Sequence, residues 1–235
     1  LNNIASIYYA QKSYKQSVDY WSKALESYPG YAEAAYRLSL ALMHSGDLTG
    51  AEYRIDSLLS DYARHPAALN LKGILLLQRG KAAESIRFFT PSLKARSTQS
   101  TALINIGSAF IALGEMQKAA RFFRAAAFSF PRDKTAMLWM AALEAQKGNT
   151  AEADRWINSL LKSMKVADLS AWMTGDAVVR LQRDSILLPD RTPEFVDAMF
   201  SCIRRALHHS EMKSLVSAFP SVETEDERFL SLFGR

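Results

Sequence analysis

The apolar positions of this chain follow a helical spacing over its first two thirds. In one clear stretch they recur at intervals of one, three or four residues, at Leu103, Ile106, Gly107, Phe110 and Leu113. This spacing places them on one face of an α-helix, at about 100° per residue, and differs from the alternation of a strand. A second helical stretch follows at 115–129, and Phe130-Pro131 ends it. The pattern therefore predicts a unit of helix, tight turn, helix and loop.

The same unit recurs with a period of 34 residues. A glycine, or a lysine in the first copy, marks the turn at Lys12, Gly46, Gly80, Gly114 and Gly148. Five residues later each copy has a small residue: Ser17, Ala51, Ser85, Ala119 and Ala153. Four residues further comes a bulky apolar one: Trp21, Ile55, Phe89, Phe123 and Ile157. A fixed period of this size is typical of an array of one supersecondary unit. We expect the glycines to end helices in the left-handed conformation. The small residue should let two helices approach closely, and the bulky residue should fill the space between them.

This unit resembles the tetratricopeptide repeat. The fourth copy carries the family's pattern most fully, at Leu103, Ile106, Gly107, Phe110, Gly114, Ala119, Phe123, Ala126 and Pro131. The resemblance covers about residues 1–161 in five copies. Two positions depart from the pattern, because Lys72 occupies a leucine position and Glu144 an aromatic one. The resemblance implies an all-α fold, a right-handed superhelical solenoid of antiparallel helix pairs.

The period also predicts the organisation of the chain. Residues 1–163 should form five stacked repeats, at 1–30, 31–64, 65–98, 99–132 and 133–163. After that the period dissolves, and 164–235 is interpreted as a helical C-terminal cap. The alternative is a sixth, decayed repeat with Ala198, Cys202 and Ala206 in its small, bulky and small positions. Leu1 corresponds to about the fourth residue of a repeat, which favours a fragment of a larger protein.

Motifs that carry chemistry are absent from the sequence. It has no glycine-rich phosphate loop, nucleophile elbow or cluster of thiols, and the adjacent His208 and His209 would point about 100° apart on a helix. We therefore expect no enzyme activity, cofactor, metal or small-molecule substrate. The apolar fraction of 49% and charged fraction of 23% are those of an ordinary soluble globular chain. The uncharged stretch 97–114 coincides with a repeat helix, so burial among helices explains it better than a membrane span. Cytoplasm and periplasm both suit such a chain.

The net charge of +5 raises nucleic acid as a partner. The basic residues are nevertheless scattered, in pairs such as Arg121 with Arg124 and Lys162 with Lys165. They do not form a dense run among exposed aromatic residues, so most are interpreted as solvated and nucleic-acid binding is not favoured.

The resemblance also implies where a partner would bind. In tetratricopeptide repeat proteins the first helix of each repeat lines a groove that holds a peptide or helix of a partner. Transferring these positions gives Tyr9, Tyr36, Arg37, Leu40, Met43, Asn70, Ile74, Leu77, Ile104, Asn105, Ser108, Ile111 and Leu138. Only Arg37 is basic, so the carboxylate clamp of Lys, Asn and Arg found in some family members is not expected. Most of the remainder is an apolar stripe, which either binds an apolar segment or is covered by tight curvature or the chain's own C-terminal helices.

The sequence therefore favours a non-catalytic protein–protein interaction module, acting as a scaffold, an adaptor or a chaperone-like protein. Its partner would be another protein or peptide with an apolar or amphipathic segment, and self-association is a further mode. The main alternative is a regulatory or substrate-presenting domain of a larger enzyme or membrane assembly, such as a glycosyltransferase, polysaccharide exporter or secretion machine. A nucleic-acid-binding array is the weaker alternative.

Overall fold

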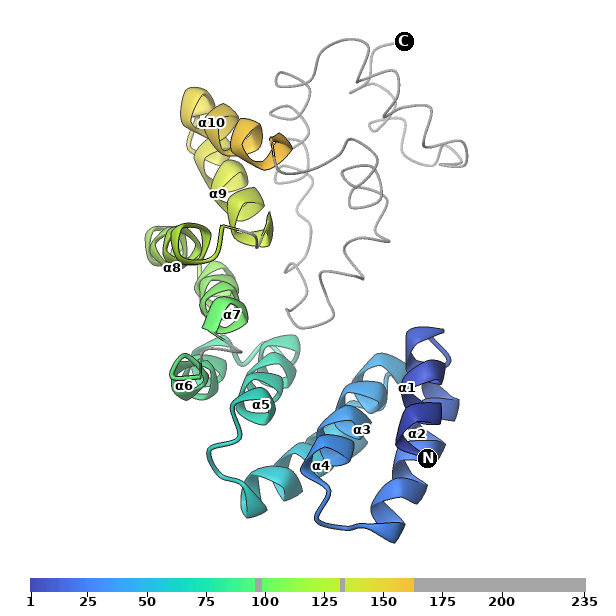
Figure 1. The fold of residues 1–235 in the computed structure, drawn as a ribbon. Coiled ribbons are helices and arrows are strands. Elements are labelled where there is room, and N and C mark those ends of the chain that lie inside the picture. Colours follow the sequence, from blue (N-terminus) through green and yellow to red (C-terminus); the bar gives the residue numbers. More distant parts are fainter. Residues whose placement is uncertain (96–98, 132–133, 163–235) are drawn as a thin grey trace. The chain divides into compact units, whose positions relative to one another are not determined.

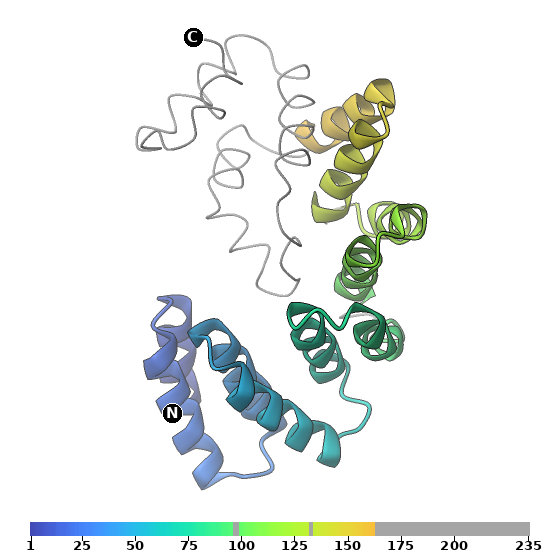
Figure 2. The same cartoon turned by 180° about the vertical axis from the view of Figure 1, so that it is seen from behind.

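The fold is known from a computed structural model that describes residues 1–95, 99–131 and 134–162. Within these ranges the chain forms ten α-helices and no strand (Figures 1 and 2). In chain order they are α1 (Asn2–Ala10), α2 (Tyr14–Ser27), α3 (Ala32–Ser45), α4 (Leu48–Asp61), α5 (Pro66–Gln78), α6 (Ala82–Ser92), α7 (Gln99–Ala112), α8 (Met116–Ser129), α9 (Lys134–Gln146) and α10 (Thr150–Leu161). The all-helical fold expected from the spacing is confirmed.

The chain divides into two compact units, Leu1–Ala102 and Leu103–Arg235, with the division inside α7. The C-terminal segment 164–235, interpreted from the sequence as a helical cap or a decayed sixth repeat, lies outside the described residues, and so do Cys202 and the His208-His209 pair.

The turn between the two helices of each pair has the conformation that the glycines predict. Gly46, Gly80, Gly114 and Gly148 all have positive φ angles, between 74° and 88°. At Gly46 the amide of the next residue, Asp47, donates to the carbonyl of Leu42 at 2.9 Å, which satisfies one of the last carbonyls of α3. Lys12 adopts the same left-handed conformation, with φ at 61°, without the freedom of a glycine.

In the first unit the helices pack as pairs, α1 with α2, α3 with α4 and α5 with α6, and α2 and α4 each contact the next pair. The small residues Ser17, Ala51 and Ser85 are fully buried, as the period predicts. The bulky residues of the same copies, Trp21, Ile55 and Phe89, are at most 1% exposed. Burying each of these large side chains contributes about 1.5–3 kcal/mol, so the repeated positions hold the unit together.

The second unit has one apolar core, formed by α8, α9 and α10 with residues of α7. The ring of Phe123 on α8 stacks on Trp139 of α9, with the ring centroids 4.8 Å apart. Ala119, Ala153 and Ile157 are fully buried, so the fourth and fifth copies use the repeat positions in the same way.

Candidate protein-binding surfaces

Helices α3 and α5 are first helices of their pairs and contact one another. Tyr36, Leu40 and Met43 on α3 are partly exposed, and so is Leu77 on α5. We call these four side chains the apolar row. Three of them stand at positions 36, 40 and 43 of α3, spaced by four and three residues, and therefore share one face of that helix. The fourth, Leu77, stands on α5, which contacts α3. The first unit thus presents an apolar strip at its first helices.

Three further predicted residues of this unit, Arg37, Asn70 and Ile74, lie on the same two helices as the apolar row. Arg37 is half-exposed, and its Nε donates to Oε1 of Glu33 at 2.5 Å, one helical turn earlier. Asn70 and Ile74 on α5 are buried, with 7% and 8% of their surface exposed. Burial of these two follows from the position of α5, because each residue from 68 to 76 is buried.

Tyr9 stands at the start of the array in a cluster of rings. Its ring centroid lies 5.6 Å from that of Trp21, 5.5 Å from that of Tyr14 and 5.7 Å from that of His44. His44 also stacks on Tyr14 at 5.1 Å, which joins the first repeat to the second. Burial lowers the pKa of His44, because the charged imidazolium would lose its hydration there.

In the second unit the predicted residues are less accessible. Ile104, Asn105, Ser108 and Leu138 are buried, and Ile111 is partly exposed. The hydroxyl of Ser108 donates to the carbonyl of Ile104 at 3.1 Å, within the same helix. Four of these five side chains therefore stand in the interior of the unit.

The two departures from the family pattern are both compensated by polar partners. Lys72 is 8% exposed, and its Nζ lies 3.0 Å from Glu52 and 2.8 Å from Asp56, both on α4. Arg79 also contacts Glu52. The hydrogen bond from Lys72 lowers the pKa of Glu52 despite its partial desolvation. Burial acts to lower the pKa of Lys72, but the hydrogen bonds to Asp56 and Glu52 raise it. Lys72, at a leucine position of the family, thus links two successive helix pairs through ion pairs.

Glu144, at the aromatic position of the fifth repeat, is 4% exposed. Burial acts to raise the pKa of its carboxyl. The carboxylate, however, accepts hydrogen bonds from Asn149 at 2.8 Å and from Lys147 at 3.0 Å, and these lower the pKa. Asn149 precedes α10, so its hydrogen bond to Glu144 stabilises the turn between α9 and α10.

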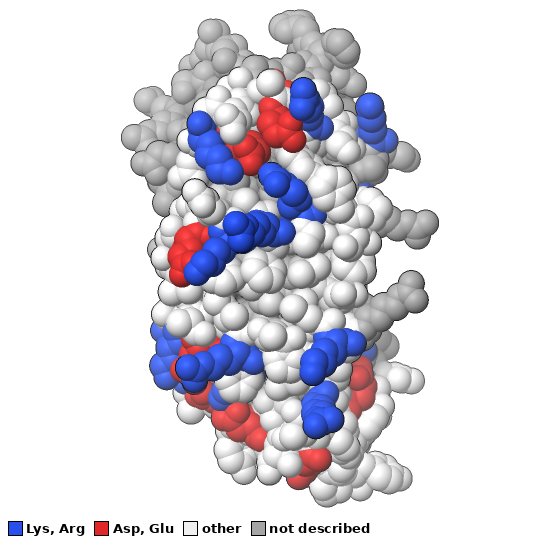
Figure 3. All heavy atoms as spheres, turned by 90° about the vertical axis from the view of Figure 1, so that its left-hand side faces the viewer, with Lys and Arg blue, Asp and Glu red and all other residues white. Residues whose placement is uncertain are grey.

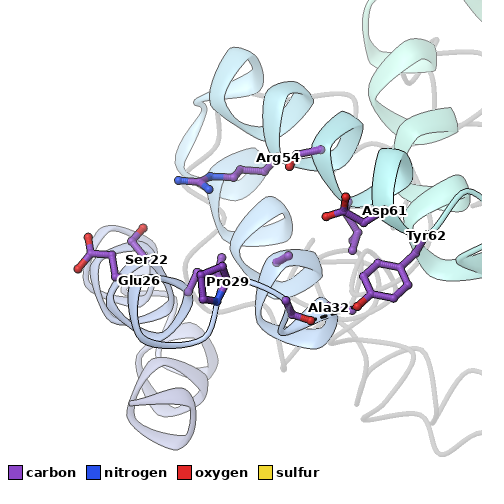
Figure 4. Close-up of a pocket in the computed structure, with 12 residues that line it drawn as sticks. Ser22, Glu26, Pro29, Ala32, Arg54, Asp61 and Tyr62 are labelled. Carbon is purple, nitrogen blue, oxygen red and sulfur yellow. Dashed lines mark hydrogen bonds between the residues drawn. The ribbon is translucent and has the colours of Figure 1, made fainter.

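A pocket that the sequence did not predict lies between the second helices α2 and α4 (Figure 4). Its volume is about 350 Å³, and α3 contributes Ala32 and Ala35 to its lining. At one end the hydroxyl of Tyr62 donates to the carbonyl of Gly30 at 3.2 Å and ties the end of α4 to the loop after α2. One signal could have found it, because Tyr28 and Tyr62 occupy the same position of successive repeats, directly after the second helix.

The charged groups do not point to nucleic acid or metal binding. On the face shown in Figure 3, Lys and Arg side chains are interspersed with Asp and Glu side chains, and wide areas carry neither. Ion pairs account for several of the basic groups, including Lys118 with Glu115 and Arg155 with Glu152. Among the described residues no group of three or more His, Cys, Asp or Glu could hold a metal ion. No helix of the described part combines the length and apolarity that crossing a membrane requires.

Comparison with known proteins identifies the repeat. Residues 8–75 and residues 104–163 each match a family model described as tetratricopeptide repeat. The fold is similar to that of PilF from Pseudomonas aeruginosa, with a TM-score of 0.64, 14% identity and coverage of 92% of this chain and 95% of that one. PilW, described as a type IV pilus biogenesis factor, gives a TM-score of 0.63 and 17% identity, covering 92% and 96%. MamA from Desulfovibrio magneticus, from residue 41 to its end, gives a TM-score of 0.58 and 17% identity. The match covers 68% of this chain and 91% of that one.

A search of curated protein sequences gave no match. The two repeat matches and these structures agree with the period of 34 residues and with the paired helices. The chain is a tetratricopeptide repeat protein. Proteins built from this repeat are in general protein-interaction modules and non-catalytic scaffolds, so another protein is the expected class of partner.

Proposed function

We propose that this chain is a non-catalytic interaction module that binds an apolar or amphipathic segment of another protein along its first helices. The observation that carries the proposal is the apolar row of α3 and α5, formed by Tyr36, Leu40, Met43 and Leu77, all partly exposed. Exposed apolar side chains gathered in one place mark interaction sites more often than isolated ones do. A groove between helices is one of the recurrent ways in which such a segment is recognised.

The spacing of the apolar row favours a helical or extended partner segment with regular apolar residues. Leu40 and Met43 lie almost one turn apart on α3, about 4.5 Å along its axis at 1.5 Å per residue. A partner helix with apolar residues at intervals of three and four could match this repeat distance. Arg37 is engaged by Glu33 at the edge of the row, so its charge is partly compensated before a partner arrives. The proposal therefore depends on apolar contact and not on capture of a carboxylate.

The experiment is a selection from a displayed library of 15-residue peptides, followed by titration of the selected peptides. The test variant is Leu40→Asp/Leu77→Asp. The control is Leu59→Asp, because Leu59 is also partly exposed but lies on the second helix α4. We expect the selected peptides to carry regularly spaced apolar residues, and to bind the wild type and the control but not the test variant. Circular dichroism of both variants checks that the helices remain. Equal binding to all three proteins would contradict the proposal.

The second candidate is a domain of a larger enzyme or membrane assembly, and PilW, which shares the fold as PilF does, is described as a type IV pilus biogenesis factor. At 14% and 17% identity, that likeness carries the fold and not the role. The two candidates differ in the origin of the partner segment. If the peptides selected above resemble a segment of a membrane-assembly component, and that component binds through the apolar row, the second candidate is supported.

A further inference from the structure

The pocket between α2 and α4 is separate from the apolar row, because none of the four side chains of that row lines it. Its floor is apolar, with Leu25 at 8% and Leu58 at 3% exposure, and Pro29 closes one side. Its polar groups come from both flanking helices, including Ser22 from α2 and Ser57 from α4. A cavity of about 350 Å³, with an apolar floor and polar groups on its sides, is of a size that small side chains or ligands enter.

Arg54 is the cation of this pocket. It extends from α4 towards α2, as Figure 4 shows, and it is half-buried. Its guanidinium lies over the ring of the neighbouring Tyr53, 5.8 Å from the ring centroid, which restrains its orientation. Among the described residues it has no ion-pair partner, although Arg37, Arg79 and Arg155 each have one. A restrained guanidinium with its donor edge unused is suited to two parallel hydrogen bonds to a carboxylate.

Two carboxylates lie among the residues around the pocket. Asp61 stands at the end of α4 with its carboxylate towards the pocket, and Glu26 stands on α2 with its carboxylate turned outwards (Figure 4). Both are exposed, whereas Arg54 is half-buried. The half-buried cation has lost more of its hydration and gains more from an added opposite charge. These two carboxylates repel any anion, but they repel a polyanion more strongly than a single carboxylate, so an isolated carboxylate fits this pocket better than a nucleic-acid backbone does.

The surroundings of the pocket resemble a protein-binding surface more than a site for a free metabolite. Tyr62 lines the pocket and is 44% exposed, while Tyr28 and Tyr53, which directly precede the lining residues Pro29 and Arg54 in the chain, are 73% and 70% exposed. Tyrosine offers a large, rigid contact area together with a hydroxyl, and it is enriched where proteins meet. One exposed tyrosine in the lining and two next to lining residues are therefore an argument for a macromolecular partner.

We propose that this pocket is a second protein-binding site, which takes an acidic side chain, Asp or Glu, of a partner protein. The carboxylate binds to the guanidinium of Arg54, the aliphatic stem lies on Leu25 and Leu58, and the exposed tyrosines contact the residues beside it. This site would let one chain hold a second protein while the first helices are occupied. It does not depend on the function proposed for the apolar row.

The test uses nuclear magnetic resonance of the full chain, observing the side-chain Nε–Hε signal of Arg54 and the backbone amides of Ser57 and Tyr62. The probes are three capped tripeptides, acetyl-Leu-Glu-Leu-amide, acetyl-Leu-Gln-Leu-amide and acetyl-Leu-Lys-Leu-amide. The glutamate peptide should shift these signals in a saturable way, with weak, millimolar affinity. The glutamine peptide, which lacks the charge, should bind at least about 5-fold more weakly.

Variants separate this site from its alternatives. Arg54→Gln should abolish the shifts, and Arg54→Lys, which keeps the charge but loses the planar fork, should give an intermediate affinity. The Leu40→Asp/Leu77→Asp variant should bind the glutamate peptide as the wild type does, so failure of one proposed site is distinguishable from failure of the other. Three results would overturn the proposal: no shift with the glutamate peptide, equal shifts with glutamate and glutamine, or preferential binding of the lysine peptide that Asp61→Asn removes.

Discussion

A Cβ atom added to Gly107 would lie 2.6 Å from Cε1 of Phe123, so the ring of Phe123 lies directly against the backbone of α7. The same relationship recurs one repeat earlier, where a Cβ on Gly73 would lie 2.4 Å from Cε1 of Phe89. Both rings are fully buried and cannot move aside without disturbing the core. The glycine and the aromatic residue are therefore two halves of one contact within each helix pair.

This contact predicts that Gly107→Ala destabilises the protein. In an exposed helix the change from glycine to alanine would stabilise by about 1 kcal/mol. Here the added methyl group overpacks the contact with Phe123 at a cost of about 1–3 kcal/mol, so we expect a net loss of up to about 2 kcal/mol. Denaturant unfolding measures it. Phe123→Leu should cost less in the Gly107→Ala background than in the wild type, because the smaller side chain relieves the overlap. A Gly107→Ala protein more stable than the wild type would contradict the contact.

The left-handed backbone of Lys12 predicts that a substitution there, by glycine, stabilises the protein. Its left-handed backbone costs about 1–2 kcal/mol relative to glycine, and the added freedom of glycine in the unfolded chain returns about 0.4–1 kcal/mol of that. Lys12→Gly should therefore stabilise the protein by up to about 1.6 kcal/mol in thermal unfolding. Gly148→Ala, at the equivalent turn with φ at 80°, is the matched control and should destabilise. If both changes had the same sign, left-handed strain would not be the cause.

The ion-pair bridge of Lys72 predicts a cost for restoring the family's own residue. Lys72→Leu removes hydrogen bonds to Glu52 and Asp56, each worth about 1.5–3 kcal/mol when a charged group is involved. The added apolar contact offsets part of this loss, so we expect a net destabilisation of about 1–2 kcal/mol near neutral pH. Because the pKa of Glu52 is lowered in the folded protein, its contribution is present above the ordinary glutamate pKa and is lost as the pH falls through the lowered value. The difference between the two proteins should therefore shrink in acid, and a difference independent of pH would argue against the ion pair.

The burial of His44 predicts that stability also depends on pH in a second range, which lies at higher pH than that of Glu52. Burial lowers its pKa from the ordinary value of 6.5, so the unfolded chain binds a proton more readily than the folded one. Its contribution to stability is full above pH 6.5 and is lost as the pH falls from there to the lowered pKa. His44→Phe keeps a ring to stack on Tyr14 and cannot titrate. Thermal unfolding at pH 5 and pH 7.5 should then differ less for His44→Phe than for the wild type, and equal differences would exclude this role.

Much of the fold could be predicted from the sequence because the same residue types recur at the same positions in five copies of the repeat. The glycine positions specified the left-handed turns, and the small and bulky positions specified the buried contacts, as at Ala119 and Phe123. These turns and contacts form within one helix pair. The period and the residue types are therefore sufficient to predict them.

The parts that the sequence did not predict depend on contacts between pairs. Lys72 stood out as a departure, but its partners lie on the preceding helix, 16 and 20 residues earlier. Only the packing of α4 against α5 brings these groups together. The pocket beside Arg54 likewise combines residues of two second helices, which motif reading treats separately. The burial of Ile104 and Leu138 was hidden for the same reason, since one face of a helix can be assigned to a groove or to a core only when its neighbours are placed.

The most direct test of the central claim, that the first helices bind an apolar segment, is site-specific photo-crosslinking. The photoreactive residue p-benzoylphenylalanine replaces Leu40 on α3 in one protein and Leu59 on α4 in another, and each is irradiated with a peptide selected by the wild type. We expect a crosslink from position 40 that excess unlabelled peptide suppresses, and none from position 59. A crosslink from position 59 alone, or equal crosslinking from both positions, would contradict the claim.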